Sequence, residues 1–76
     1  MSKPVHVFRL VWIHETEEGR AEIMMSYADH DADEAVRNVG LFLPDYFALR
    51  RCEIITRDAD VPPGRVWQPE PRNGSE

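Results

Sequence analysis

The chain has 76 residues and a mass of 8.8 kDa, so it forms one domain with a single small hydrophobic core. Fourteen acidic residues outnumber nine lysines and arginines, and the net charge of −5 argues against a general binder of nucleic acids or membrane surfaces. A single cysteine excludes an intrachain disulfide, no apolar run is long enough for a transmembrane helix, and no signal-peptide cleavage site follows the first residues; we therefore expect a cytoplasmic protein.

The first predicted element is a strand over residues 5–13, a segment rich in β-branched and aromatic residues. Its valines alternate with Phe8, Leu10 and Trp12, so both faces of the strand are largely apolar. Such a strand belongs in the middle of a sheet, because a strand with one solvated face alternates apolar and polar residues. We expect a helix to cover the valine face and a different segment to cover the face of Phe8, Leu10 and Trp12.

A β-hairpin connects this strand to the next one. Residues 15–20 form the turn, with Gly19 at its tight point, and residues 21–27 return as the second strand. Because the connection is a tight turn, the two strands are expected to run antiparallel to each other.

A short helix follows, and its start is marked by the acidic residues of segment 29–34. Asp31 is suited to the N-cap position, and Glu34 three positions later completes the spacing of a capping box. Gly40 is typical of a helix end. The apolar residues between these ends recur at helical spacing and should face the sheet. They are Ala32, Ala35, Val36 and Val39.

Residues 49–57 are predicted to form a third strand, after which the composition changes. Four of the six prolines and two of the four glycines follow residue 57, so the chain divides into a compact domain of residues 1–57 and a C-terminal tail of residues 58–76. Trp67 stands out in this tail, because so large an apolar ring usually needs a surface to rest on.

The predicted fold class is therefore α+β. Two hairpin strands, a helix and a third strand give a ββαβ chain with a small antiparallel sheet in the order 2-1-3 and one helix packed on one face. Residues 66–68 are a candidate for an extra short edge strand. We expect the tail, anchored by Trp67, to cover the remaining apolar face, so we favour a monomer over a homodimer.

No pattern indicates catalysis, a metal site or a cofactor. Asp29, Asp31 and Asp33 resemble the start of an EF-hand loop, but Glu34 stands where that loop needs glycine and Gly40 where it needs a glutamate. The single cysteine lies in an apolar strand and reads as a small core residue. We expect a protein that is not an enzyme and that holds neither a metal nor a cofactor.

The uneven distribution of charge is the most informative feature. Residues 15–34 hold eight acidic residues against one arginine. In the predicted fold the turn, the second strand and the helix start line one side of the sheet. Their carboxylates would either serve solubility or steer association with a basic partner, as a nucleic-acid mimic does. The predicted partner-binding residues are Glu15, Glu17, Glu18, Glu22, Asp29, Asp31 and Asp33.

The overall build of residues 5–57, with the helix DADEAVRNVG packed after the hairpin, resembles the small acidic phage-borne anti-CRISPR proteins. The resemblance lies in build and not in a motif, so it transfers no functional residue. It implies an inhibitor in the cytoplasm of the bacterial host that binds a CRISPR effector complex, whose channels are rich in lysine and arginine. We therefore expect a protein partner with a basic surface, and neither direct nucleic-acid binding nor membrane binding.

Two other functions remain open at this point. One is a homodimeric structural or regulatory module that pairs through the face of Phe8, Leu10 and Trp12. The other is a small RNA-binding module that uses the basic residues of the third strand. These basic residues are Arg50, Arg51 and Arg57. If the acidic residues are not the binding site, the alternative interface consists of Phe8, Trp12, Phe42, Tyr46 and Phe47.

Overall fold

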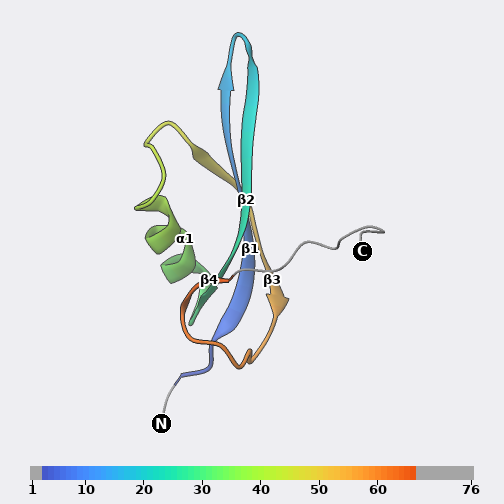
Figure 1. The fold of residues 1–76 in the computed structure, drawn as a ribbon, viewed down its shortest axis with the longest axis vertical. Helices are drawn as coiled ribbons and strands as arrows, with labels where there is room; N and C mark the ends of the chain where they lie inside the picture. The colour runs from blue at the N-terminus through green and yellow to red at the C-terminus, as the bar shows by residue number, and fades with distance from the viewer. Residues whose placement is uncertain (1–2, 67–76) are drawn as a thin grey trace, which may run out of the picture.

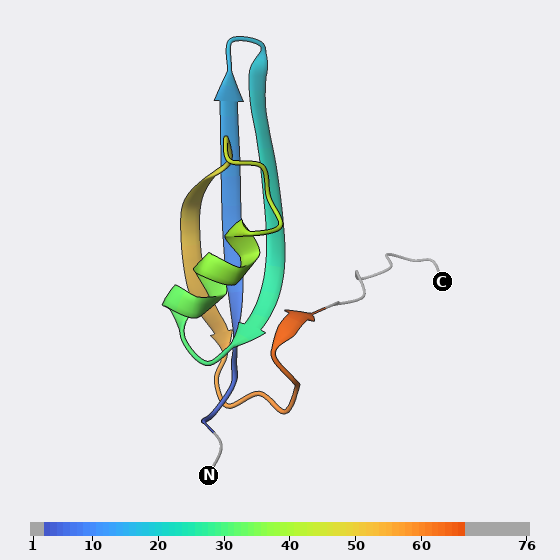
Figure 2. The same cartoon turned by 90° about the vertical axis from the view of Figure 1, so that its left-hand side faces the viewer.

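The computed structural model describes residues 3–66, which form a four-stranded antiparallel sheet with one helix on one side (Figure 1 and Figure 2). The strands lie in the order β3-β1-β2-β4, so β1 is central, flanked by both β2 and β3. This confirms the α+β class. The elements are β1 (His6–Thr16), β2 (Gly19–Asp29), α1 (Ala32–Gly40), β3 (Ala48–Thr56) and β4 (Gly64–Val66).

The fourth strand corrects the predicted topology. The chain is ββαββ, and β4 adds to the outer edge of β2, where Ser26 pairs with Val66 and Ala28 with Gly64. The order 2-1-3 is therefore incomplete, and the segment predicted to be a tail from residue 58 contributes a short edge strand, which begins two residues before the candidate strand at residues 66–68. Trp67, which we predicted to anchor the tail on the remaining apolar face, lies outside the described residues.

The hairpin formed by β1 and β2 is longer than predicted, since each strand has eleven residues. Thr16 pairs with Gly19, which leaves Glu17 and Glu18 as the turn. Gly19 has a φ of 149°, a conformation that residues with a side chain rarely adopt. Because both strands are this long, the end of the hairpin projects well beyond α1 and the other strands (Figure 1).

The core lies between α1 and the sheet, and it corrects the predicted use of the two faces of β1. Phe8, Leu10 and Trp12 are at most 6% exposed and pack against Ala35 and Val39 of α1. The helix therefore covers the aromatic face and not the valine face. A homodimer through Phe8, Leu10 and Trp12 is wrong for this fold, because these side chains lie beneath the helix.

The start of α1 is as predicted. The Asp31 side chain accepts a hydrogen bond from the Glu34 backbone N–H at 2.9 Å, so Asp31 is the N-cap. Gly40 is the last helical residue, but its φ is not positive, and Leu41 continues in the right-handed helical conformation. The helix thus runs directly into the turns of the next connection instead of ending in a left-handed glycine.

Candidate functional site

The predicted acidic residues fall into two groups at opposite ends of β2. Glu15, Glu17, Glu18 and Glu22 lie at or near the hairpin turn, whereas the aspartates lie at the other end of β2 and the start of α1. At about 3.3 Å per strand residue, even the nearest members of the two groups, Glu22 and Asp29 of β2, are about 23 Å apart along the strand. The structure therefore does not gather the seven residues into the single acidic surface that the sequence predicted.

The aspartates at the start of α1 have structural contacts. Asp29 is only 4% exposed; its Oδ1 accepts the His30 backbone N–H at 2.8 Å and its Oδ2 accepts the Asn38 side-chain amide at 2.9 Å. Asp31 caps the helix. Asp33 is exposed. Two of the three predicted aspartates thus hold the fold together and are poorly placed to bind a partner.

The hairpin end carries the carboxylates that are available to a partner. Glu15 is paired, because both Nε and Nη2 of Arg20 bond to its Oε2, at 3.1 and 2.9 Å. Glu17, Glu18 and Glu22 are exposed, and none of them forms an ion pair within the part of the chain that the structure describes. We define these three residues as the acidic tip.

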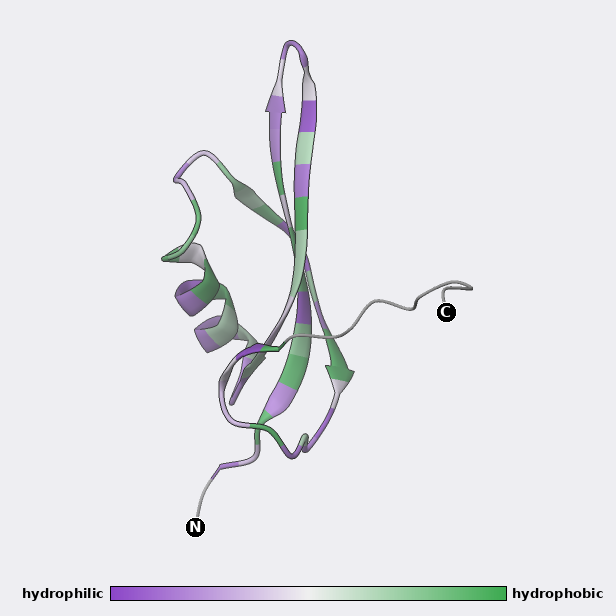
Figure 3. Cartoon of the chain, viewed as in Figure 1, coloured by the Kyte–Doolittle hydropathy of each residue, from purple (hydrophilic) through white to green (hydrophobic). Residues whose placement is uncertain are grey.

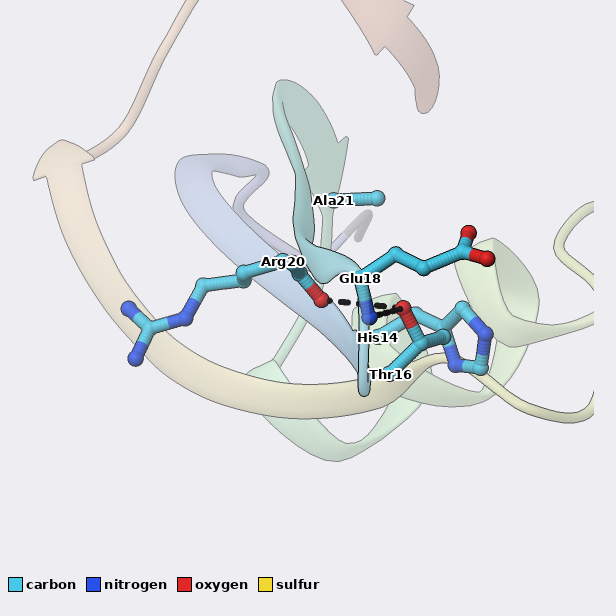
Figure 4. Close-up of a pocket in the computed structure, with 6 residues that line it drawn as sticks. His14, Thr16, Glu18, Arg20 and Ala21 are labelled. Atoms are coloured by element: carbon cyan, nitrogen blue, oxygen red, sulfur yellow. Dashed lines mark hydrogen bonds between the residues drawn. The ribbon is translucent and has the colours of Figure 1, made fainter.

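Two hydrogen bonds of one side chain fix the backbone of the turn. The Thr16 hydroxyl accepts from the Glu18 backbone N–H and donates to the Gly19 carbonyl oxygen, both at 3.2 Å (Figure 4). Arg20 extends to the opposite side of the ribbon from His14, Thr16 and Glu18 (Figure 4). The residues here surround an open depression of about 300 Å³, which is lined by His14, Thr16, Glu18, Gly19, Arg20 and Ala21.

The connection between α1 and β3 forms a second exposed feature. Leu41, Phe42 and Tyr46 are 78%, 71% and 60% exposed, whereas Leu43 and Phe47 turn inward and pack against the core. The alternative interface predicted from the sequence is thus divided: Phe42 and Tyr46 are on the surface and Phe47 is half-buried, but Phe8 and Trp12 are core residues. Figure 3 shows the hydrophobic colouring at the end of α1 and again where β3 begins.

The three arginines in and just after β3 do not form a compact basic patch. Arg51 pairs with Val11, whereas Arg50 falls at a bulge in the register, and Arg57 lies about 20 Å further along the strand direction. On the sheet face that α1 leaves uncovered, the strand residues that share a face with Val11 include no aromatic residue on which a base could stack. The predicted RNA-binding surface therefore lacks its stacking platform.

Cys52 lies in β3 opposite Leu10 and is half-buried. Burial, and to a lesser extent the carboxylates of Asp33 and Glu53, raises the pKa of the Cys52 thiol. A raised pKa keeps the thiol protonated at neutral pH, and the protonated form is a poor nucleophile. The thiol therefore behaves as a packing group.

Comparisons of the chain with protein-family models, with curated proteins and with solved structures find no match. Among residues 3–66, no three histidine, cysteine, aspartate or glutamate side chains are grouped so as to hold a metal ion. The helix in this range is too short to cross a membrane. The candidate site is therefore defined by surface shape and charge, at the acidic tip and the neighbouring connection.

Proposed function

We propose that this chain is a non-enzymatic protein–protein inhibitor of the anti-CRISPR type, which binds a basic surface of a CRISPR effector complex and blocks its handling of nucleic acid. The observation that carries the proposal is the acidic tip: Glu17, Glu18 and Glu22 form no ion pair with any described residue, and they lie at or near the end of a hairpin that projects past the core (Figure 1). A surface that holds phosphates is rich in lysine and arginine and attracts such carboxylates.

The shape of the hairpin also supports this proposal. It is a two-stranded ribbon, and neighbouring strands are only about 4.8 Å apart, so its end is narrow enough to enter a channel built for a nucleic-acid strand. The Thr16 hydroxyl holds the turn in one conformation, which reduces the entropy lost on binding. The predicted binding residues are thereby reduced from seven to the three of the acidic tip, with Glu15 held by Arg20 beside them.

The test is phage plaquing on cells with an active CRISPR system that express the chain, repeated across effector types. The wild-type chain should let the phage form plaques, because it inhibits CRISPR immunity. Glu17→Lys with Glu18→Lys should abolish this inhibition. A matched double variant, Asp33→Lys with Asp60→Lys, changes the net charge equally at exposed positions away from the tip and should retain it. The tip substitutions and Asp60→Lys should each change stability by less than about 0.5 kcal/mol, and Asp33→Lys, in the first turn of α1, should cost up to about 1 kcal/mol through the helix dipole, so both variants remain folded.

Two outcomes contradict the proposal. One is that the wild-type chain fails to restore phage plaquing with every effector type. The other is that the wild-type chain and the tip variant restore plaquing equally. Where plaquing is restored, binding of the isolated effector should weaken steeply between low and physiological salt, mainly through a slower association rate.

A further inference from the structure

The outer side of β3 is an unpaired edge of the sheet. β3 is hydrogen-bonded to β1 on one side, and within residues 3–66 no backbone group bonds to its other side (Figure 2). Such an edge is a template for a further strand, and natural proteins protect it with lysine, proline, bulges or very short strands. β3 has nine residues and contains neither lysine nor proline. Two of its large apolar side chains, Leu49 and Ile54, are 39% and 37% exposed.

The middle of β3 is regular. Residues 51–54 pair in unbroken register with β1, and a bulge lies on either side of them. Because bulges interrupt pairing, an added strand is confined to the stretch between them, which we call the edge segment. Arg51 and Glu53 lie on the sheet face away from α1, whereas Cys52 lies opposite the core residue Leu10 on the face toward α1.

The edge segment carries one cation and one anion on the same face of the sheet, two residues apart. Arg51 forms no ion pair with any described residue. Glu53 has a single described partner, Arg9 of β1, at 3.8 Å, and both of these side chains are 43% exposed. Each charge can therefore take a partner of opposite sign from outside the chain.

Backbone geometry limits how the edge segments of two copies can pair. Residues of an antiparallel edge alternate between those whose N–H and C=O point outward and those whose groups point inward, and only residues of the same kind can face each other. A two-fold axis must therefore pass through a residue. An axis through Arg51 or Glu53 places like charges opposite each other, and an axis through Ile54 pairs no opposite charges. An axis through Cys52 places Arg51 opposite the partner's Glu53 at two symmetric positions.

We propose that this chain forms a two-fold symmetric homodimer, in which the edge segments of two copies pair antiparallel about Cys52 and join the two sheets into one. Each Glu53 then lies between Arg9 of its own chain and the partner's Arg51, and cross-strand pairs of opposite charge stabilise a sheet. The small thiol of Cys52 suits a position where two copies of one side chain meet. The dimer differs from the monomer expected from the sequence, and it uses a surface other than the acidic tip, so it goes beyond the function proposed above.

One charge near the axis opposes this pairing. Asp33 of α1 lies close enough to Cys52 for its carboxylate to raise the pKa of the thiol, so the Asp33 side chains of two copies lie near each other. The two pairs of Arg51 with Glu53 outnumber this single repulsion. An interface of one short strand segment per copy is smaller than that of a permanent dimer, so the assembly should be reversible and depend on concentration.

The test is sedimentation equilibrium of the full chain over a wide range of concentrations in reducing buffer. The average mass should rise from the 8.8 kDa of one chain toward twice that value. Arg51→Glu places glutamates opposite each other at both symmetric positions and should weaken association by about tenfold to a hundredfold. Arg57→Glu is the matched control, with the same change of charge at an exposed position beyond the second bulge, and should weaken it far less. Asp33→Asn should strengthen it.

A mixture of two single variants tests the register itself. Arg51→Glu presents two glutamates along the edge segment and Glu53→Arg presents two arginines, so each variant repels its own copies. In the mixture every glutamate faces an arginine, and a heterodimer should form with about the affinity of the wild-type homodimer. Circular dichroism checks that both variants are folded, since Glu53→Arg also loses the contact with Arg9. If Glu53→Arg does not fold, the comparison of Arg51→Glu with Arg57→Glu still decides.

Three results overturn the proposal. A mass of one chain at every concentration would mean that the edge stays open or that another segment of the same chain covers it. Association that Arg51→Glu weakens no more than Arg57→Glu does would place the contact elsewhere on the molecule. Folded single variants that do not associate when mixed would exclude this register. None of these measurements uses a CRISPR effector, so the two proposals fail separately.

Discussion

Asn38 of α1 donates its side-chain amide to Oδ2 of Asp29 at 2.9 Å and so ties the helix to the end of β2. The other oxygen of the same carboxylate accepts the backbone N–H of His30 at 2.8 Å. These two bonds explain how a carboxylate can be only 4% exposed in a molecule this small, because a buried polar group is costly unless it is bonded. The acidic run in the sequence thus includes a side chain that belongs to the core.

Asp29→Ala should therefore lower the free energy of unfolding by about 1–3 kcal/mol, since it leaves the Asn38 amide and the His30 N–H without their acceptor. Asp33→Ala, at an exposed position four residues away, should cost less than about 0.5 kcal/mol. Urea denaturation of both variants measures the difference. Equal midpoints for the two would show that the Asp29 contacts contribute nothing net.

Glycine-to-alanine substitutions should have opposite effects at two positions. At Gly40 the new methyl carbon would lie 3.7 Å from Cη2 of Trp12, an ordinary contact, and the helical φ suits alanine. Gly40→Ala should stabilise the fold by about 0.5–1 kcal/mol. Gly19 has open space around it but a φ of 149°, so Gly19→Ala should destabilise by about 1–3 kcal/mol. Thermal melting of both variants checks these predictions. If both substitutions raised the melting temperature, or both lowered it, the predicted difference between the two glycines would be wrong.

The Cys52 thiol should make stability depend on alkaline pH. Burial raises the folded-state pKa of the thiol above its ordinary value of 9.0, so the folded protein favours the protonated form. This contribution is complete below the unfolded-state pKa and is lost as the pH rises through the folded-state pKa. The unfolding free energy of the wild type should consequently fall more steeply above pH 9 than that of Cys52→Ala. Parallel pH profiles for the two proteins would mean that the thiol titrates equally in both states.

His14 should control how firmly the connection between α1 and β3 is held. His14→Ala removes both the hydrogen bond to the Tyr46 carbonyl and the ring contacts, so amide hydrogen exchange of Phe47 should become faster. His14→Phe keeps an aromatic ring and should produce a smaller increase. Exchange of Leu10, in the core of the sheet, serves as the internal reference and should not change. Equal Phe47 exchange in all three proteins would show that His14 does not anchor the connection.

The central position of β1 and the cap of α1 could be predicted because each has a local signal: apolar residues on both faces of the strand, and an aspartate three positions before Glu34. The face that α1 covers could not be predicted in this way, since both faces are apolar. Side-chain size explains the outcome, because Phe8, Leu10 and Trp12 bury more apolar area beneath a helix than valines do.

The two remaining errors have different physical causes. The acidic residues are close in the chain, but an extended strand separates its ends by about 3.3 Å per residue, so closeness in sequence did not mean closeness in space. β4 has three residues and follows two prolines, and its pairing with β2 depends on partners that are far away in the sequence. A strand that short carries no periodicity of its own, so the sequence offered residues 66–68 only as a candidate edge strand and did not place it beside β2.

The projecting hairpin places its turn where a substitution need not affect the stability of the core. Its turn lies beyond the helix-covered core, and Glu17 and Glu18 contribute no side chain to the hydrophobic cluster. Substitutions or short insertions between them should therefore be tolerated, as they are at exposed loop ends in general. Successive variants can then acquire new partners without a compensating change in the core. For the same reason, the chain offers a small scaffold on which a foreign peptide can be displayed at the end of the hairpin.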